Sequence, residues 1–287
     1  MAAPQRSRVL RAAGDEDEYV SKVRRRMLDA AQRLVDRAGG LTVSLESMTL
    51  DQVIKEAGVS RTSVYREWDK KEDFYVDLLC DLAGPSWQGT AAFDEETIRL
   101  ARSIVAERIE ELRTEEGRRR VLRETVRRAA RQNFNAVVAS SQWRTYVALT
   151  ATVMSLSDNE ARTRVRDALQ AAERVFIERM SNFYADMSIM FGFRLKSYIN
   201  SYETLAAVGA SVVEGLGLRQ SLTPDIVNRQ IMIPGPDGPE EWHLAALGFL
   251  GILEQCIEPQ PDYNPDDALK DYLKQLASRE KLVSSAP

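Results

Sequence analysis

The residues best suited to chemistry in this 287-residue chain lie in the segment RTSVYREW, residues 61–68. Val64 and Trp68 are four positions apart, so on a helix both would face the same core. That leaves four outward side chains that can donate hydrogen bonds: Arg61, Thr62, Ser63 and Arg66. Donors of this kind can bind base edges in the major groove of DNA.

Capping signals place this run on the second of two short helices. Thr49 and Gln52 predict a capping box that opens a helix through Ala57. Gly58 can take the positive φ of a tight turn, and Ser60 is a good N-cap for the next helix. Four apolar side chains would pack the two helices together: Val53, Ile54, Ala57 and Val59. The pattern predicts a helix-turn-helix, which occurs in DNA-binding proteins and in others.

The rest of the chain is also expected to be helical. A stripe from Val23 to Ala38 ends at two glycines, and Asp69 with Glu72 predicts a second capping box. Further helices are expected near residues 95–113, 117–139, 141–156, 158–191, 201–220, 241–257 and 265–282. The segment IPGPDGP, residues 233–239, is expected to be a loop, and no alternating strand pattern of useful length is found. The sequence therefore predicts an all-α fold.

Composition narrows the classes of protein. The chain is 44% hydrophobic and 29% charged, an ordinary globular balance, and it has no apolar run long enough for a membrane span or a secretory signal. Two distant cysteines and the single His243 predict no disulfide framework, no metal site and no cofactor. Residues 20–71 hold eleven basic and seven acidic side chains, a modest basic excess. We expect a cytoplasmic protein that is not an enzyme.

Residues 49–74, TLDQVIKEAGVSRTSVYREWDKKEDF, resemble the signature of the tetracycline-repressor (TetR) family of bacterial transcription regulators. The resemblance rests on the run from Ala57 to Ser60, on Tyr65 five residues after that serine, on Trp68, and on Lys71 with the glutamate that follows. It extends over about residues 22–82. It implies a homodimeric repressor that binds a palindromic operator in double-stranded DNA and is released by a small, largely apolar effector.

The resemblance also implies roles for individual residues. Arg61, Thr62 and Ser63 would approach base edges, whereas Tyr65 and Lys71 would contact phosphates. The DNA-binding residues expected on this basis are Thr49, Ser60, Arg61, Thr62, Ser63, Tyr65, Arg66 and Lys71.

The sequence departs from the family pattern at two positions. Thr62 replaces a glycine, which would add a base contact or crowd the groove. Glu67 and Trp68 replace the usual His-Phe pair, and Glu67 would repel phosphate if it faced DNA. Three arginines of the first helix would lie near DNA or on a solvated face: Arg24, Arg25 and Arg26.

The expected organisation is a disordered arm (1–19), a helix-turn-helix DNA-binding domain (20–83), a helical-bundle ligand-binding and dimerisation domain (90–258), and a C-terminal extension with a short helix (259–287). An apolar stripe on the helix near 158–191 is either bundle core or one wall of an effector cavity. The candidate effector-binding residues are Phe134, Trp143, Tyr146, Met154, Phe176, Met180, Phe183 and Tyr184.

Residues 205–218 and 244–257 would form helices that are apolar around most of their circumference. They would be buried in a four-helix interface between two subunits or inside one subunit. The candidate interface residues are Ala206, Gly209, Val213, Leu216, Leu244, Leu247, Gly248, Leu250 and Gly251. His243 precedes the second helix as an interface or capping residue.

Seven arginines gather in residues 118–131, where nearby acidic side chains favour a solvated or salt-bridged helix over a site for an anionic effector. Three other functions stay open at this stage. The chain could be an interaction module that has lost DNA binding, an activator of the same family, or an enzyme on a helical bundle. The last has no catalytic set of residues to support it.

Overall fold

The structure of the chain is a computed structural model that describes residues 22–42, 48–84, 94–157, 159–236, 238–268 and 270–271. The expected disordered arm, most of the C-terminal extension and residues 43–47 lie outside the described residues. The chain divides into two compact units. Unit 1 comprises residues 1–90 and 140–173, and unit 2 comprises residues 91–139 and 174–287.

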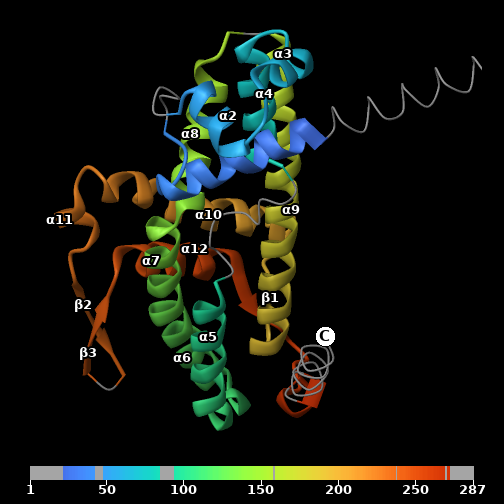
Figure 1. The fold of residues 1–287 in the computed structure, drawn as a ribbon. Helices are drawn as coiled ribbons and strands as arrows, with labels where there is room; N and C mark the ends of the chain where they lie inside the picture. Colours follow the sequence, from blue (N-terminus) through green and yellow to red (C-terminus); the bar gives the residue numbers. More distant parts are fainter. Residues whose placement is uncertain are drawn as a thin grey trace, which may run out of the picture. The chain divides into compact units, whose positions relative to one another are not determined.

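Unit 1 is helical throughout its described part. A helix over residues 22–37 is followed by α2 (Leu50–Ala57), α3 (Arg61–Glu67) and α4 (Lys71–Leu82). Figure 1 shows these helices together with α8 (Ser141–Ser155) and the start of α9 (Glu160–Phe191). One apolar core joins them, and it includes Met27, Val53, Phe74, Leu149 and Val165. Residues 140–173 lie in the range expected from the sequence to belong to the second domain, and they contribute Leu149 and Val165 to the core that the helix-turn-helix shares.

A glycine allows α8 to approach the end of the first helix. Gly40 has a φ of +121°, and a Cβ there would lie 2.8 Å from both the Cβ of Arg144 and the carbonyl oxygen of Ser141. Beside it, the backbone N–H of Leu41 donates to the hydroxyl of Thr145. A larger residue at position 40 would strain the backbone and separate the two segments.

Unit 2 contains the remaining helices and two small antiparallel sheets. Its elements are α5 (Glu95–Glu107), η3 (Ile109–Arg113), α6 (Glu115–Thr125), the π-helical turn η4 (Val126–Ala130), α7 (Arg131–Ala139), the rest of α9, β1 (Phe193–Leu195), α10 (Tyr202–Gln220), α11 (Pro224–Val227), β2 (Ile231–Gly235), β3 (Gly238–Trp242), α12 (Leu244–Cys256) and β4 (Ile257–Pro259). β1 pairs with β4, and β2 pairs with β3. Helices make up most of the described chain, so the predicted all-α class is confirmed, with these strands as additions.

The β2–β3 hairpin, drawn in orange in Figure 1, corrects the predicted loop at residues 233–239. Ile231 pairs with Trp242 at one end and Gly235 with Gly238 at the other. Trp242 is fully buried, so burial of this side chain helps to fix the hairpin. Two prolines within the paired residues hide the strand in the sequence, because proline cannot donate to a ladder and usually marks a loop or an edge.

Two of the three helix caps predicted for residues 49–72 are confirmed. Thr49 and Gln52 form both hydrogen bonds of the capping box, and the Ser60 hydroxyl accepts from the backbone of Ser63. The predicted capping box of Asp69 with Glu72 is wrong. α4 starts at Lys71, one residue later than that box requires. Its N-cap is therefore Lys70, whose side chain makes no capping hydrogen bond.

Two predicted helices of unit 2 are interrupted. The helix expected over 95–113 ends at Glu107 and continues as η3, and the helix expected over 117–139 contains the π-helical turn. α6 packs closely on η3 at Gly117, where a Cβ would lie 1.9 Å from the carbonyl oxygen of Glu111. Glycine is therefore required at position 117.

Candidate nucleic-acid interface

The helix α3 presents a polar face outward, as the sequence predicts. Val64 and Trp68 are buried in the core of unit 1, whereas Arg61, Thr62, Tyr65 and Arg66 are exposed. Ser63 is half-buried, and its hydroxyl lies 2.8 Å from the hydroxyl of Ser60. Four long or polar side chains are thus available on the outer face, while Ser60 and Ser63 also serve the helix cap.

The turn between α2 and α3 is fixed by glycine and by an arginine from the first helix. Gly58 has a φ of +62°, and its N–H bonds to the carbonyls of Ile54 and Lys55. The Arg26 guanidinium donates to the carbonyl oxygens of Ala57 at 2.7 Å and Gly58 at 3.1 Å. These bonds satisfy carbonyls that the end of α2 leaves without helical partners, so Arg26 positions the turn.

The neighbouring arginines of the first helix also have partners within unit 1. Arg24 lies 2.8 Å from a carboxylate oxygen of Asp77 and 3.3 Å from one of Glu67, and Arg25 pairs with Asp29 at 2.9 Å. Arg24 and Arg26 therefore stabilise the helix-turn-helix, in addition to any contact with DNA, whereas the Arg25–Asp29 pair lies within the first helix.

Glu67 does not add negative charge to the outer face of α3. Its side chain is only 7% exposed, and its carboxylate faces Arg24. The repulsion of phosphate that would follow from an outward Glu67 is therefore not expected. Position 67 is the last residue of α3, where the helix turns toward the core.

A buried carboxylate that was not among the residues predicted from the sequence holds the end of α3. Asp77 accepts hydrogen bonds from the indole N–H of Trp68 at 2.7 Å and from Arg164 at 2.5 Å, and it pairs with Arg24. A buried carboxylate must have such partners, because an unpaired buried charge is strongly unfavourable. An aspartate among apolar residues on a predicted helix is the sequence signal for this arrangement.

Arg61 on α3 and Lys71 at the start of α4 form only exposed ion pairs. Arg61 pairs with Asp51 at 2.6 Å, but both side chains are about two-thirds exposed. The Nζ of Lys71 lies 3.8 Å from a carboxylate oxygen of Glu72, and these two side chains are also about two-thirds exposed. Exposed pairs of this kind contribute about 0–1 kcal/mol, so either cation can exchange its partner for a phosphate or a base. Thr49 is exposed too, although its hydroxyl is bonded within the capping box.

No family model matches the chain, and no curated protein matches it. Three solved structures with a similar arrangement are a candidate transcriptional regulator from Rhodococcus sp. RHA1, the reduced form of E. coli NemR, and a candidate TetR family regulator from Vibrio parahaemolyticus. Two of them are described as transcriptional regulators. Sequence identities are 12%, 16% and 14%, and TM-scores are 0.40, 0.41 and 0.34, in that order. The matches cover 80%, 83% and 81% of this chain and 94%, 98% and 97% of the others.

The candidate effector-binding residues are divided between the two units. Trp143, Tyr146 and Met154 lie on α8 in unit 1, where Met154 is 78% exposed. In unit 2, Phe134 is fully buried and its ring lies 4.9 Å from the ring of His243. Of the remaining candidates on α9, Phe176 and Met180 are buried with Ala206 of α10, and the ring of Tyr184 lies 5.5 Å from the ring of Phe249. Phe183 is half-buried, and its ring lies 5.8 Å from the ring of Tyr184. A role in binding an effector stays a prediction for all of these residues.

Some of the candidate interface residues on α10 and α12 pack against each other within one chain. A Cβ at Gly209 would lie 2.8 Å from the ring of Phe249, and one at Gly248 would lie 3.1 Å from Val212. Ala206 and Leu250 are buried as well, whereas Val213, Leu216, Leu244 and Leu247 are half-buried. Gly251 is exposed, and no described atom lies within 4 Å of where its Cβ would be. The two helices thus pack against each other and keep an outer surface near Gly251.

The arginine run of residues 118–131 is salt-bridged, as the sequence favours, but not wholly solvated. Arg119 and Arg120 pair with Glu115 and Glu116 one turn earlier on the same helix. Arg118 is buried instead, with its guanidinium 4.4 Å from the ring centre of Tyr263.

Two further observations concern the described residues only. Among them, no helix is both long and apolar enough to cross a membrane. No cluster of three or more histidine, cysteine or acidic side chains suited to a metal ion is found in the same part of the chain.

His243, which the sequence placed as an interface or capping residue, is the N-cap of α12 and accepts a hydrogen bond from the N–H of Ala245.

Proposed function

We propose that this chain is a cytoplasmic, homodimeric regulator of transcription that binds a palindromic operator through its helix-turn-helix. The observation that supports this proposal is the outer face of α3, where Arg61, Thr62, Tyr65 and Arg66 are exposed on a helix held by a buried core. Such a helix can enter the major groove, so we call α3 the recognition helix. Arg61 suits guanine, and Tyr65 and Lys71 suit phosphates.

Two copies are required because one short helix reads few bases. A two-fold dimer places two recognition helices roughly 34–36 Å apart, one helical turn of DNA. The outer surface of α10 and α12 near Gly251 is the candidate for that contact. Val208 and Leu218 are exposed apolar side chains on α10, and burying them in a dimer would be favourable.

We further propose that a small-molecule effector weakens the operator complex, which makes the chain a repressor. An effector that binds better to a dimer with a different spacing of its recognition helices lowers DNA affinity by the difference in its binding free energies. Such couplings are typically about 1–3 kcal/mol, which corresponds to partial release at saturating effector. The same arrangement permits activation, since the fold does not determine the sign of regulation.

A helix-turn-helix that has lost DNA binding is less well supported. Two features favour it: the small basic excess of residues 20–71, and a negative charge at Glu67 if that side chain faced outward. The Glu67 carboxylate lies against Arg24 instead, so the second feature gives it no support. The absence of a catalytic set in the sequence, which has one histidine, likewise gives an enzyme little support.

In-vitro selection on randomised duplexes at near-physiological salt tests the proposal. A two-fold symmetric motif is expected, with half-sites one helical turn apart. No enrichment by a folded, dimeric sample, with and without cell extract, would contradict DNA binding. The extract matters because a chain that needs its effector in order to bind would enrich a motif only when the extract is present.

A further inference from the structure

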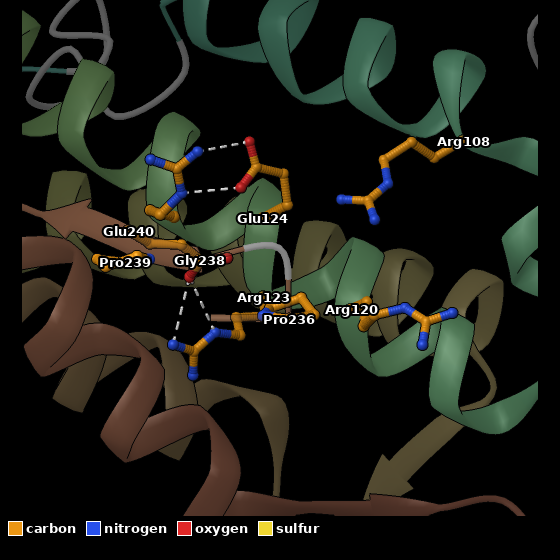
Figure 2. A pocket seen from close by; sticks show the side chains of 9 residues that line it. Arg108, Arg120, Arg123, Glu124, Pro236, Gly238, Pro239 and Glu240 are labelled. Atoms are coloured by element: carbon orange, nitrogen blue, oxygen red, sulfur yellow. Dashed lines mark hydrogen bonds and ion pairs between the residues drawn. The ribbon is translucent and has the colours of Figure 1, made fainter. Parts of the chain in front are cut away.

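A pocket in unit 2 is lined by arginines from two helical segments and by the β2–β3 hairpin. Its volume is about 290 Å³, and its lining residues are Arg108, Arg120, Arg123, Glu124, Arg127, Pro236, Gly238, Pro239 and Glu240. Figure 2 shows the guanidinium groups on both sides of the pocket. We propose that this pocket binds a small organic dianion, such as a short dicarboxylate or a phosphate ester.

Arg127 forms a rigid, charged wall. Its Nε and Nη2 donate to the two carboxylate oxygens of Glu124 at 2.8 Å each, and its Nη1 donates to the backbone carbonyl of Glu241. The hydrogen bonds to Glu124 raise the pKa of Arg127 further above its ordinary value, so the guanidinium stays protonated. Because most of its donors are used, Arg127 supplies positive charge rather than a direct bond to the ligand.

Arg123 is the side chain best placed to bind an anion directly. Its only described carboxylate partner within the lining is Glu240, and both hydrogen bonds between them are long, at 3.4 Å. The guanidinium lies 4.8 Å from the ring centre of Trp242, which keeps it oriented without using its N–H groups. Glu240 also accepts from the indole of Trp242 at 3.2 Å. A ligand carboxylate could therefore replace Glu240 at Arg123 at small cost.

Arg108 and Arg120 form the opposite side. Figure 2 draws no bond from either of them to another residue of the lining. Their carboxylate partners, Glu111 and Glu116, lie outside the lining, and the bonds from Arg108 and Arg120 lower the pKa of Glu111. Arginine has five N–H donors, and Arg120 donates through Nε to Glu111 and through Nη1 to Glu116, so its remaining N–H groups can still bind an anion. Arg120 and Arg123 are thus the two lining residues that could bind an anion directly.

The lining fits a dianion with a short carbon skeleton. Four guanidinium groups and two carboxylates line the pocket, while Glu111 and Glu116, which pair with Arg108 and Arg120, lie outside the lining. The charged groups of the lining itself are therefore mainly cationic. The rings of Pro236 and Pro239 offer apolar contact between the charged sides. The volume is near the lower end of small-molecule sites, about 300–1,000 Å³, which excludes large ligands. This ligand class differs from the apolar effector expected from the sequence.

Binding of the anion to the pocket does not depend on the proposed function. An effect of the anion on DNA binding does rest on the proposed function. If the dianion is the effector, it should shift operator affinity. Binding is therefore measured on the protein without DNA, and operator release is measured separately. A dianion that binds a protein with no operator would leave the pocket established and refute the proposed function.

Calorimetric titration of the full chain with succinate and with inorganic phosphate tests the proposal, at constant ionic strength set with chloride. Saturable binding is expected for at least one of them, and acetate should bind more weakly. Arg123→Gln and Arg120→Gln should each weaken binding about tenfold or more, because a charge-assisted hydrogen bond is lost. Glu240→Gln should strengthen binding, since it removes the competing carboxylate.

Arg99→Gln is the matched control, because it removes one positive charge at an exposed position of α5 outside the lining. Circular dichroism shows that each variant is folded. The proposal is overturned if neither succinate nor phosphate binds saturably to the folded chain. It is also overturned if Arg99→Gln weakens binding as much as Arg123→Gln, because the effect would then be one of net charge.

Discussion

The indole N–H of Trp68 donates a 2.7 Å hydrogen bond to the buried carboxylate of Asp77, which ties the end of the recognition helix to the middle of α4. The same carboxylate accepts from Arg164 on α9 and pairs with Arg24 on the first helix. Three separate segments therefore meet at one side chain. The orientation of α3 depends on this aspartate as well as on apolar packing.

Trp68→Phe should destabilise the protein by about 1–3 kcal/mol, since it removes a donor from a buried carboxylate. Urea unfolding measures the change. Asp77→Asn should destabilise too, and in that background Trp68→Phe should cost less, because the charged acceptor is gone. Equal costs of Trp68→Phe in both backgrounds would show that the hydrogen bond contributes little.

Arg61→Ala should weaken operator binding by about 1–3 kcal/mol and relax specificity at one base position. Asp51→Asn should have the opposite effect on affinity, because it frees Arg61 from its 2.6 Å ion pair. Fluorescence anisotropy with operator variants measures both. Arg229→Ala, an exposed change in unit 2, is the control and should bind as the parent does. Unchanged discrimination between operator variants in Arg61→Ala would remove this residue from the base-reading set.

Lys71→Ala should weaken binding to specific and random duplexes alike. The slope of log affinity against log salt should fall by about one unit, because one phosphate contact is lost. Titrations at several salt concentrations give the slope. Lys270→Ala removes the same charge from an exposed position near the other end of the chain and should leave the slope unaltered.

His243 should make stability depend on pH. Burial, together with the positive charge of Arg131, lowers the pKa of His243 below its ordinary value of 6.5. The folded state therefore favours neutral imidazole, whose Nδ1 accepts from the Ala245 N–H. The resulting stabilisation is complete above the unfolded pKa of about 6.5 and is lost as the pH falls from there toward the lower folded pKa.

Thermal unfolding between pH 7.5 and 5.5 measures this loss of stability. His243→Asn keeps an N-cap acceptor without a titrating ring, so its stability should vary less over that range. The comparison isolates the single histidine from the carboxylates, which both proteins share. Parallel curves for the two proteins would contradict the role of His243.

Gly251→Glu should convert the proposed dimer to a monomer while leaving the fold intact, because position 251 is open within the chain. Light scattering measures the mass, and circular dichroism the helix content. Asn182→Glu places the same charge at an exposed position on α9 and is the control. A change at Gly209 is a poor test of dimerisation, since a Cβ there already collides with Phe249 of the same chain. A Gly251→Glu dimer would place the interface elsewhere.

The helix-turn-helix could be predicted closely because its signals are local. Thr49, Gln52, Gly58 and Ser60 act through bonds to residues three or four positions away, and a short segment of sequence contains both partners. The start of α4 was misplaced by the same reasoning. Asp69 and Glu72 have the right spacing, but the chain bends through Lys70 before the helix begins.

Long-range partners could not be predicted. Asp77 and Arg164 are 87 positions apart, and nothing in their local sequence indicates that they meet. The same holds for Arg123 and Glu240, which are 117 positions apart and line the pocket. The hairpin was missed because its stability comes from burial of Trp242, whereas its own residues include prolines that suggest a loop.

The π-helical turn at residues 126–130 acts as a one-residue insertion into the helical segment that runs from α6 through α7. One residue corresponds to a rotation of about 100° in a regular helix. Arg123, before the turn, faces the hairpin, and Phe134, after it, faces His243. Removal of a single residue there would restore a regular helix and break one of these two alignments. The pocket and the neighbouring core can coexist on this segment because its helical phase changes between them.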